Sequence, residues 1–361
     1  MSHCVPGLRM RVTSCNLRKR KSLKPGRAGC GHANPASVAP VMRGLTATAA
    51  TLGLLLSFAP AAAQAQPYPS KIVRIVASEA GGAGDFVARI LAQGLASSWG
   101  QQVVIDNRVG GVIAGDVVAR SAPDGYTVLL YGNTLWLLPL MRKQVPYDPH
   151  RDFLPVTLIS RAPAMLLVHP SVPAKSAKEL IAIARARPGQ LNYASAALGT
   201  SNHIAAELFK HMAKVDIVRV AYRGAASAFT SVLSGQVDVL FMLGAGIMPV
   251  VQSGKVRALA VTSLQPSPLF PNLPTVASAG LPGYEMYSLF GLFTPAGTAP
   301  AIVSRLNQET VRIFQSPEVR DRLAATGVES VGSTPEALVA TIQSEVTRIR
   351  GVVASAGLRE Q

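Results

Sequence analysis

The sequence predicts an α/β protein with two lobes, each a mainly parallel sheet flanked by helices. From residue 68 onward, short β-branched runs alternate with amphipathic stretches, as in parallel sheets that are covered by helices. The alternation restarts after His169-Pro170, and five prolines between residues 266 and 282 mark a crossing segment before a further strand. We therefore expect one lobe from residues 66–168 plus 286–361, a second from residues 169–285, and a ligand-binding cleft between them.

The first 65 residues differ from the rest of the chain. They hold nine basic residues, no acidic residue and all three cysteines, so setting them aside lowers the formal charge from +16 to +7. An apolar stretch over residues 45–59 precedes Ala63-Gln64-Ala65, a small-x-small pattern that predicts signal-peptide cleavage near Ala65. The stretch is shorter than the ~20 residues that span a bilayer. We expect an exported protein; Met42 offers a conventional start, which would place residues 1–41 upstream of the true one.

Setting the leader aside also narrows the chemistry. The basic run at residues 18–21 belongs to the leader, so we expect no nucleic-acid partner. The chain after residue 65 has no cysteine, which excludes disulfides, thiolate catalysis and cysteine-based metal sites there.

The first strand–helix block begins with a strand that ends in a glycine turn. Strands are expected at residues 72–77, 103–106, 127–131 and 164–169, separated by turn signals such as Pro123-Asp124-Gly125. After Gly81-Gly82-Ala83-Gly84, apolar residues recur near the helical period and predict a helix with one buried face: Phe86, Val87, Ile90, Leu91 and Leu95.

The second block opens with a capping box, in which Ser176 caps a helix and Glu179 reaches back to its start. That helix is expected to end at Arg187-Pro188-Gly189. Further strands are expected at residues 191–195, 217–221, 237–241 and 257–262, and another at 286–293 after the proline-rich segment.

The C-terminal region is predicted to be helical. Ser316-Pro317-Glu318 and Thr334-Pro335-Glu336 each offer an N-cap, a proline at the first helical position and an acid in the first turn. The helix before them has its own apolar face, formed by Ile302, Val303, Leu306, Ile313 and Phe314.

Three strand-to-helix turns are candidates for ligand binding. In the first, Gly82-Ala83-Gly84-Asp85 would expose backbone N–H groups at a helix start, which suits an anion. Asp106, 24 positions after Gly82, superficially completes a dinucleotide fingerprint, but Val87 stands where the third glycine belongs. A turn needed only for packing is the simpler alternative.

The other two turns lie in the second block. Residues 194–203 gather small and hydroxyl side chains, and His203 falls near the predicted helix start, where it more often caps or packs than contacts a ligand. Residues 221–226 place Tyr222 and Arg223 at a similar turn. Arg223 either pairs with a carboxylate or is simply solvated.

No catalytic pattern emerges from the sequence. The four histidines after the leader have no metal-ligand spacing, and there is no Gly-x-Ser-x-Gly elbow or phosphate loop. A binding protein without a cofactor therefore fits better than an enzyme. Two alternatives stay open: a secreted α/β enzyme, either a hydrolase or dinucleotide-dependent through the Gly82 turn, and an envelope protein whose +7 surface meets anionic partners.

An ordered series of motifs resembles the tripartite tricarboxylate transporter substrate-binding proteins, also called the Bug family. The series covers essentially the whole chain after the leader and runs as follows: Tyr68-Pro69-Ser70-Lys71-Ile72-Val73-Arg74-Ile75-Val76, Gly81-Gly82-Ala83-Gly84-Asp85-Phe86-Val87-Ala88-Arg89, Val103-Val104-Ile105-Asp106-Asn107-Arg108, Ala119-Arg120-Ser121-Ala122-Pro123-Asp124-Gly125-Tyr126-Thr127, Leu191-Asn192-Tyr193-Ala194-Ser195, Val220-Ala221-Tyr222-Arg223-Gly224, Gly235-Gln236-Val237-Asp238, Leu273-Pro274-Thr275-Val276 and Pro295-Ala296-Gly297-Thr298. Each motif alone is weak, but their succession is specific.

The resemblance implies a two-lobed periplasmic binding protein (a Venus flytrap, type II-like) that closes on a small carboxylated solute. It implies main-chain amides and hydroxyls as ligands, and on this chain the expected ligand-binding residues are Ser78, Gly81, Gly82, Ala83, Asp85, Ser195, Gly199, Thr200, Ser201, His203, Tyr222 and Arg223. It also implies that the protein hands its organic, aromatic or amino acid to membrane permease components, or serves as a sensor. The sequence shows no hydrophobic tails or heptads, so we expect a monomer.

Some residues depart from the family pattern. Glu79 and Ala80 replace the usual Ala-Pro of the first turn, and a carboxylate at Glu79 would repel a multiply charged ligand. Alanines replace glycine and hydroxyl residues after Tyr193, and the glycine segment at residues 109–111 is short. We therefore expect a monocarboxylate with an apolar or aromatic body rather than a tricarboxylate.

Overall fold

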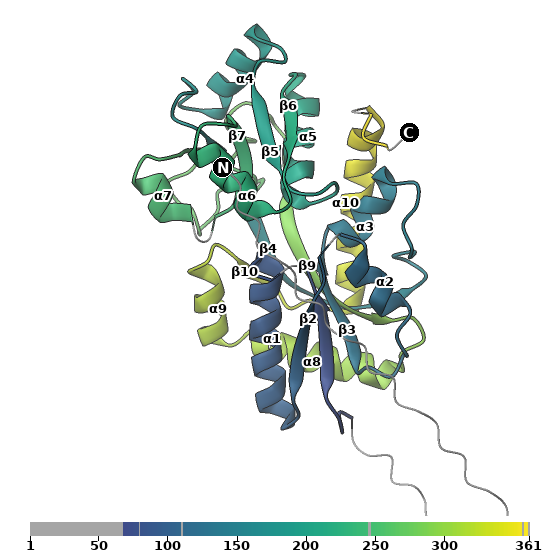
Figure 1. Cartoon of the computed structure of the whole chain (residues 1–361). Helices are drawn as coiled ribbons and strands as arrows, with labels where there is room; N and C mark the ends of the chain where they lie inside the picture. The colour runs from purple at the N-terminus through teal and green to yellow at the C-terminus, as the bar shows by residue number, and fades with distance from the viewer. Residues whose placement is uncertain (1–67, 79, 110, 245–246, 356, 360–361) are drawn as a thin grey trace, which may run out of the picture. The chain divides into compact units, whose positions relative to one another are not determined.

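The computed structural model describes residues 68–359, except 79, 110, 245–246 and 356 (Figure 1). The expected leader and its cleavage site lie outside the described residues, as does Glu79. Within the described part, no helix is long and apolar enough to cross a membrane.

Helices and strands alternate along most of the chain, as the sequence predicts. The strands are β1 (Val73–Ala77), β2 (Val103–Asn107), β3 (Thr127–Gly132), β4 (Phe153–Val168), β5 (Asn192–Ser195), β6 (Val218–Ala221), β7 (Val239–Leu243), β8 (Arg257–Val261), β9 (Tyr287–Pro295) and β10 (Glu329–Ser330). The helices are α1 (Ala83–Trp99), α2 (Ile113–Ala119), α3 (Thr134–Met141), α4 (Ala177–Ala186), α5 (Ser201–Ala213), α6 (Ala225–Leu233), α7 (Met248–Gln252), α8 (Pro300–Phe314), α9 (Pro317–Ala324) and α10 (Pro335–Ser355).

The strands form one sheet in two halves, in the order β2-β1-β3-β9-β4-β7-β5-β6 (Figure 1). In the first half β1 pairs in parallel with β2 and β3, and in the second half β5 pairs in parallel with β6 and β7. The two long strands β4 and β9 run antiparallel to their neighbours and join the halves. The α/β prediction is confirmed, and its parallel ladders lie outside this antiparallel centre.

Strand β4 corrects one boundary of the sequence analysis. The strand expected at residues 164–169 is only the second half of β4, which begins at Phe153. Its first half pairs with β9, and the ladder shifts register twice between Pro155 and Ser160. No element is predicted from the sequence for residues 153–163, which contain Pro155 and Pro163, and a strand accommodates proline where no ladder hydrogen bond is required. β4 then continues into the second half of the sheet, where Ala164 pairs with Leu243 of β7.

The buried core is continuous on one face of the sheet and divided on the other. One cluster includes Trp136 of α3, Phe209 of α5 and Ile349 of α10, and it covers both halves. On the opposite face, a cluster around α1 and α8 covers the first half and a separate cluster around α6 covers the second. The halves are therefore tied firmly along one face only, which suits hinge bending.

All three predicted N-cap positions are confirmed, and two of them carry a capping hydrogen bond. The Ser176 hydroxyl accepts the Glu179 N–H at 3.2 Å, and the Thr334 hydroxyl accepts the Ala337 N–H at 3.2 Å. Ser316 is the N-cap of α9, but its hydroxyl donates to the Ile313 carbonyl at 2.8 Å and accepts no N–H of α9. Since α8 ends at Phe314, Ser316 satisfies a carbonyl of the helix before it rather than an N–H of the helix after it.

Candidate functional site

The predicted site residues lie in three turns, each leading from a strand into a helix. The first loop (residues 78–85) joins β1 to α1, the second loop (residues 195–203) joins β5 to α5, and the third loop (residues 222–224) joins β6 to α6. The helices have Gly82, Thr200 and Gly224 as N-caps, all in extended conformations and none with a side-chain cap. Their first two N–H groups therefore remain available to an anion, whereas the third in α5, that of His203, donates to Asn202 Oδ1 at 2.9 Å.

The first loop is held in shape by Asp85. The Asp85 carboxylate accepts the Gly81 N–H at 2.9 Å, Arg89 Nε at 3.0 Å and Asn107 Nδ2 at 3.0 Å. Asn107 also donates to the Ser78 carbonyl at 2.7 Å, and Gly81 has a φ of 80°, which favours glycine. The loop is thus tied at both ends to one buried carboxylate.

These contacts decide the charge state of Asp85. Burial acts to raise the pKa of Asp85, but the hydrogen bonds from Gly81, Arg89 and Asn107 together outweigh it and lower the pKa below its ordinary value. The carboxylate is ionised, and the Arg89 guanidinium balances its charge. Its oxygens are occupied inside the protein, so Asp85 shapes the loop rather than meeting a solute.

The second loop rests on a positive charge. Arg219 of β6 donates from Nε to the Ser195 hydroxyl at 2.7 Å and from Nη2 to the Ala196 carbonyl at 2.9 Å. Among the described residues, no carboxylate lies within ion-pair distance of Arg219. Arg219 therefore engages acceptor oxygens of the loop and leaves a positive charge beneath it.

His203 belongs to the interior of the second loop. Its side chain is fully buried, and Nδ1 accepts the Gly199 N–H at 3.4 Å. Burial first, and then the charges of Arg219 and Lys210, lower the pKa of His203 to about 3. The ring is neutral with its proton on Nε2, an atom that has no hydrogen-bond partner among the described residues.

The third loop lies directly beside the second. The Tyr222 N–H donates to the Ser195 carbonyl at 2.8 Å, so the parallel pairing of β5 and β6 brings both turns to one edge of the sheet. The Arg223 side chain is exposed, and no hydrogen bond or ion pair with the described residues holds it. It is a cation available at the rim of the loops.

Strand β9 brings the first and second loops together. Ser288 donates to the Ser201 hydroxyl of the second loop at 2.6 Å. Two residues along the same strand, Phe290 packs under Gly84, where an added Cβ would lie 3.3 Å from the ring and 2.7 Å from Ser78 Oγ. Residues two apart on a strand share a face, about 7 Å from each other. The two loops therefore meet on one face of β9.

A buried polar cluster at the start of α3 also holds the backbone of β9 in place. Asn133, the N-cap of α3, accepts the Leu289 N–H at 2.8 Å and donates to the Tyr287 carbonyl at 3.1 Å. Asn133 also donates to Glu345 of α10, which accepts Trp136 Nε1 at 2.6 Å. Burial raises the pKa of Glu345 to about 7, against the lowering effect of these two hydrogen bonds. A carboxyl that titrates near neutrality therefore supports β9.

The residues that suggested a dinucleotide site are arranged otherwise. Asp106 pairs with Arg108 at 2.8 Å and with Arg74 at 3.6 Å, so its carboxylate is engaged by two guanidinium groups. Val87, in place of the third glycine, is fully buried in the core. In the described part of the chain, no three His, Cys, Asp or Glu side chains are grouped so as to hold a metal ion.

Sequence reasoning missed the residues that hold the loops. Arg219 stands between Val218 and Val220 in a short strand, and a charged residue between two apolar strand residues was the one signal in the sequence that could have indicated its role. Asn107 and Ser288 gave no signal, because their partners lie 22 and 87 positions away.

Comparisons with known proteins match most of the described chain. The sequence model of the tripartite tricarboxylate transporter family receptor matches residues 87–358. Protein BugT of Bordetella pertussis is 35% identical over 323 residues, which cover 87% of this chain and 99% of BugT.

Two solved structures are also similar. Rpa4515 of R. palustris, solved with adipate, is 36% identical with a TM-score of 0.76, and the match covers 80% of this chain and 98% of that one. MatC of Rhodopseudomonas palustris, solved with malate, is 31% identical with a TM-score of 0.73, and the match covers 79% and 100%.

Proposed function

This chain belongs to the tripartite tricarboxylate transporter receptor family, and from that premise we propose that it captures a small organic acid in the periplasm between its first, second and third loops. It is a solute-binding protein of the Bug type. In this proposal it is exported by a signal peptide cleaved near Ala65 and passes its solute to membrane components of a transporter.

The charge beneath the second loop carries the proposal. Arg219 takes up two acceptors of the second loop, the Ser195 hydroxyl oxygen and the Ala196 carbonyl, and the first N–H groups of α5 stay available beside them. A carboxylate placed there meets N–H donors, a helix N-terminus and a cation in one position. Among the described residues of the first loop, the charge of Asp85 is neutralised by Arg89. In the described part of the first loop no positive charge is left over, so the solute's carboxylate is placed on the second and third loops.

The predicted residues take roles that their contacts support, and Ser78 and Gly81 shape the first loop through Asn107 and Asp85. Gly82 and Ala83 present the N-terminus of α1, Ser195, Gly199, Thr200 and Ser201 surround that of α5, and Tyr222 and Arg223 flank that of α6. Asp85 and His203 act as positioning residues, since each accepts an N–H from a glycine of its own loop.

The solute class follows from the loops and the relatives together. Rpa4515 was solved with adipate and MatC with malate, and both ligands are dicarboxylates. One carboxylate would occupy the second loop and the other the exposed Arg223, while the exposed Ala197 of the second loop faces an apolar body. We expect adipate and apolar monocarboxylates to bind more tightly than citrate.

Binding favours the closed form of the protein. A carboxylate at a favourable helix N-terminus contributes about 0.3–2 kcal/mol, and exclusion of water strengthens each further hydrogen bond. Because the halves are tied along one face of the sheet only, the solute stabilises a closed arrangement that the hinge strands permit.

A ligand panel tests the proposal. Thermal unfolding of the protein purified after export would be followed with adipate, malate, citrate, benzoate and NAD. A ligand at 1,000 times its Kd raises stability by about 4.1 kcal/mol, which is several degrees for a domain of this size. A rise with adipate and none with NAD is expected. A rise with NAD alone, or none with adipate, malate or citrate, would overturn the proposal.

A further inference from the structure

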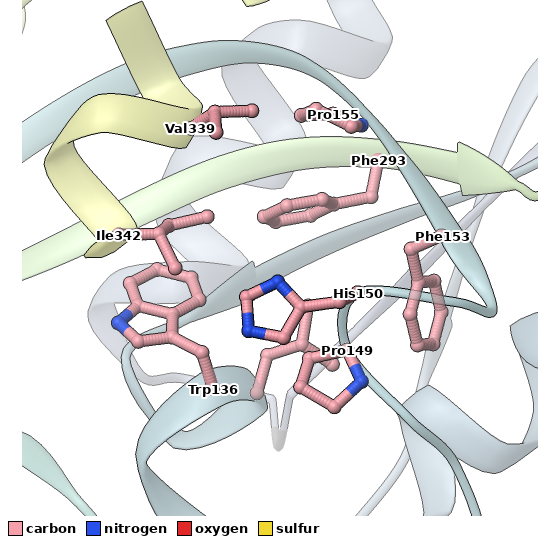
Figure 2. A pocket seen from close by; sticks show the side chains of 9 residues that line it. Trp136, Pro149, His150, Phe153, Pro155, Phe293, Val339 and Ile342 are labelled. Carbon is pink, nitrogen blue, oxygen red and sulfur yellow. The ribbon is translucent and has the colours of Figure 1, made fainter. Parts of the chain in front are cut away.

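A cavity lies outside the three loops, between α3, α10 and the segment that leads into β4. We name it the Trp136 groove. Its apolar end, of about 180 Å³, is lined by side chains that include Trp136, Phe153, Phe293, Val339 and Ile342 (Figure 2). An adjoining basic end, of about 360 Å³, shares Trp136, Pro149 and His150 with it.

The apolar end is an aromatic chamber with preset walls. The Phe293 ring centroid lies 6.2 Å from that of Trp136 and 6.5 Å from that of Phe153. The Trp136 N–H is engaged by Glu345 at 2.6 Å, so the indole is held in place. Figure 2 shows the rings of Trp136, His150 and Phe293 around a common space that Val339 and Ile342 of α10 close on one side.

The size and lining of this end select an aromatic ring. An apolar cavity of ~150 Å³ is large enough to hold benzene. Aromatic walls contribute edge-to-face contacts in addition to the burial of area. Val339 is 36% exposed beside the chamber, so a ring inside would also cover an apolar side chain that is now in water.

The basic end has the opposite character. Lys143 and Arg350 line it with exposed side chains, and Arg142 and His150 line it too. One carboxylate, that of Asp148, is among the lining residues. It accepts the N–H groups of His150 at 2.9 Å and Arg151 at 3.2 Å and so stabilises the turn at residues 148–151. Cations at one end and a ring-sized apolar chamber at the other complement a ligand with a carboxylate at one end and a ring at the other.

We propose that the Trp136 groove is a second ligand site, which binds an aromatic acid with the ring in the apolar chamber and the carboxylate at the Lys143 and Arg350 end. The two cavities together fall in the ~300–1,000 Å³ range of small-molecule sites. None of the groove residues belongs to the three solute loops, so the proposal stands independently of the proposed function. The link between the sites is α3, whose Thr134 hydroxyl donates to the Gly199 carbonyl at 3.3 Å.

The experiment uses Trp136 as its own reporter. The chain has two tryptophans, so Trp99→Phe leaves Trp136 as the single emitter. This variant would be titrated with 3-phenylpropionate, and a saturable change in Trp136 emission is expected. The neutral analogue 3-phenylpropanol should bind about tenfold more weakly at low salt, and the difference should shrink as salt screens the basic end.

Variants in the Trp99→Phe background locate the binding. Val339→Phe fills the chamber from an exposed position and should weaken 3-phenylpropionate at least tenfold, whereas Ile72→Phe, exposed elsewhere, should not. Lys143→Glu with Arg350→Glu should weaken it about tenfold, and Lys255→Glu with Arg320→Glu serves as the matched charge control.

Two results would overturn the proposal. One is an emission that does not respond to 3-phenylpropionate at millimolar concentrations. The other is an affinity that Val339→Phe and the Lys143/Arg350 reversal leave unchanged while Arg219→Met abolishes it, which would place the acid at the solute loops. Adipate, which lacks a ring, should leave the groove empty, so its binding or failure to bind reports on the proposed function alone.

Discussion

The first and second loops are each held by one charged side chain, but the charges are opposite. Under the first loop, Asp85 accepts an N–H from Gly81, so part of that loop's donor capacity is used inside the protein. Under the second loop, Arg219 donates to Ser195 and Ala196, so the loop's acceptors are used instead. The two loops look alike as strand-to-helix turns and differ in what they have left to offer a ligand.

The difference assigns unequal tasks to the two loops. The second loop uses two of its acceptors for Arg219 and lies next to that cation, so it is suited to bind a carboxylate. The first loop uses its Gly81 N–H for Asp85, whose charge Arg89 neutralises, so it is suited to pack against the solute's body. The carboxylate-binding energy should therefore concentrate on the second loop, and substitutions can test this.

The largest expected effect is on the stability of the folded protein. It comes from Glu345, which accepts hydrogen bonds from Asn133 and Trp136 beside β9, the strand that both loops contact. The pKa of Glu345 is raised to about 7 from an ordinary 4.5. Between these values the unfolded chain loses its proton while the folded protein keeps it, so stability falls as pH rises. The loss should reach about 2–3 kcal/mol by pH 7.5, since each pKa unit corresponds to about 1.4 kcal/mol. Denaturant unfolding from pH 4 to 8 measures it.

Glu345→Gln should remove that slope, and Glu336→Gln, an exposed glutamate on the same helix, should keep it. Arg348 and Glu285 also act on Glu345, with opposite signs, so both stay unchanged in the comparison. An equal slope in the two variants would show that Glu345 is not the responsible group.

The second effect separates the loops. Arg219→Met removes the charge and both hydrogen bonds beneath the second loop, and charged hydrogen bonds contribute about 1.5–3 kcal/mol. We expect the Kd for adipate to rise roughly 30-fold, measured by calorimetry. Arg185→Met is the matched control, because Arg185 also donates twice to a carbonyl, that of Ala213, away from the loops. A comparable loss of affinity in both variants would remove the special role of Arg219.

The smallest effect concerns the first loop. Asp85→Asn places an amide N–H₂ next to N–H groups that now donate to the carboxylate. The free energy of unfolding should therefore fall by about 1–2 kcal/mol, while the Kd for adipate should change less than fivefold. The lowered pKa of Asp85 makes its contribution present above the ordinary value of 3.8 and lost as pH falls below it. The variant should therefore lose less stability than the parent protein on acidification.

Thermal unfolding and calorimetry on the same samples check both parts. Asp116→Asn is the control, since Asp116 pairs with Arg120 at i,i+4 as Asp85 does with Arg89 but holds no loop N–H. If Asp85→Asn weakened adipate as much as Arg219→Met, the division of tasks between the loops would be wrong.

The sequence by itself determined the elements and the location of the three turns. Glycines, capping residues and the period of apolar side chains act within a few positions, so the start of α1 after Gly82 and the capping of α4 by Ser176 followed from local patterns. The first half of β4 was not predicted, because it is held by a pairing with β9 whose register shifts twice after Pro155, and no local pattern encodes that pairing.

Only the tertiary structure decided what lies beneath and between those turns. Arg219 reaches Ser195 because β5 and β6 pair in a particular register, and Glu345 meets Asn133 across 212 positions. The Trp136 groove likewise combines α3, the start of β4, β9 and α10. Such contacts depend on strand register and helix packing, which arise from the whole chain at once, whereas the turns depend on neighbours that the sequence already places side by side.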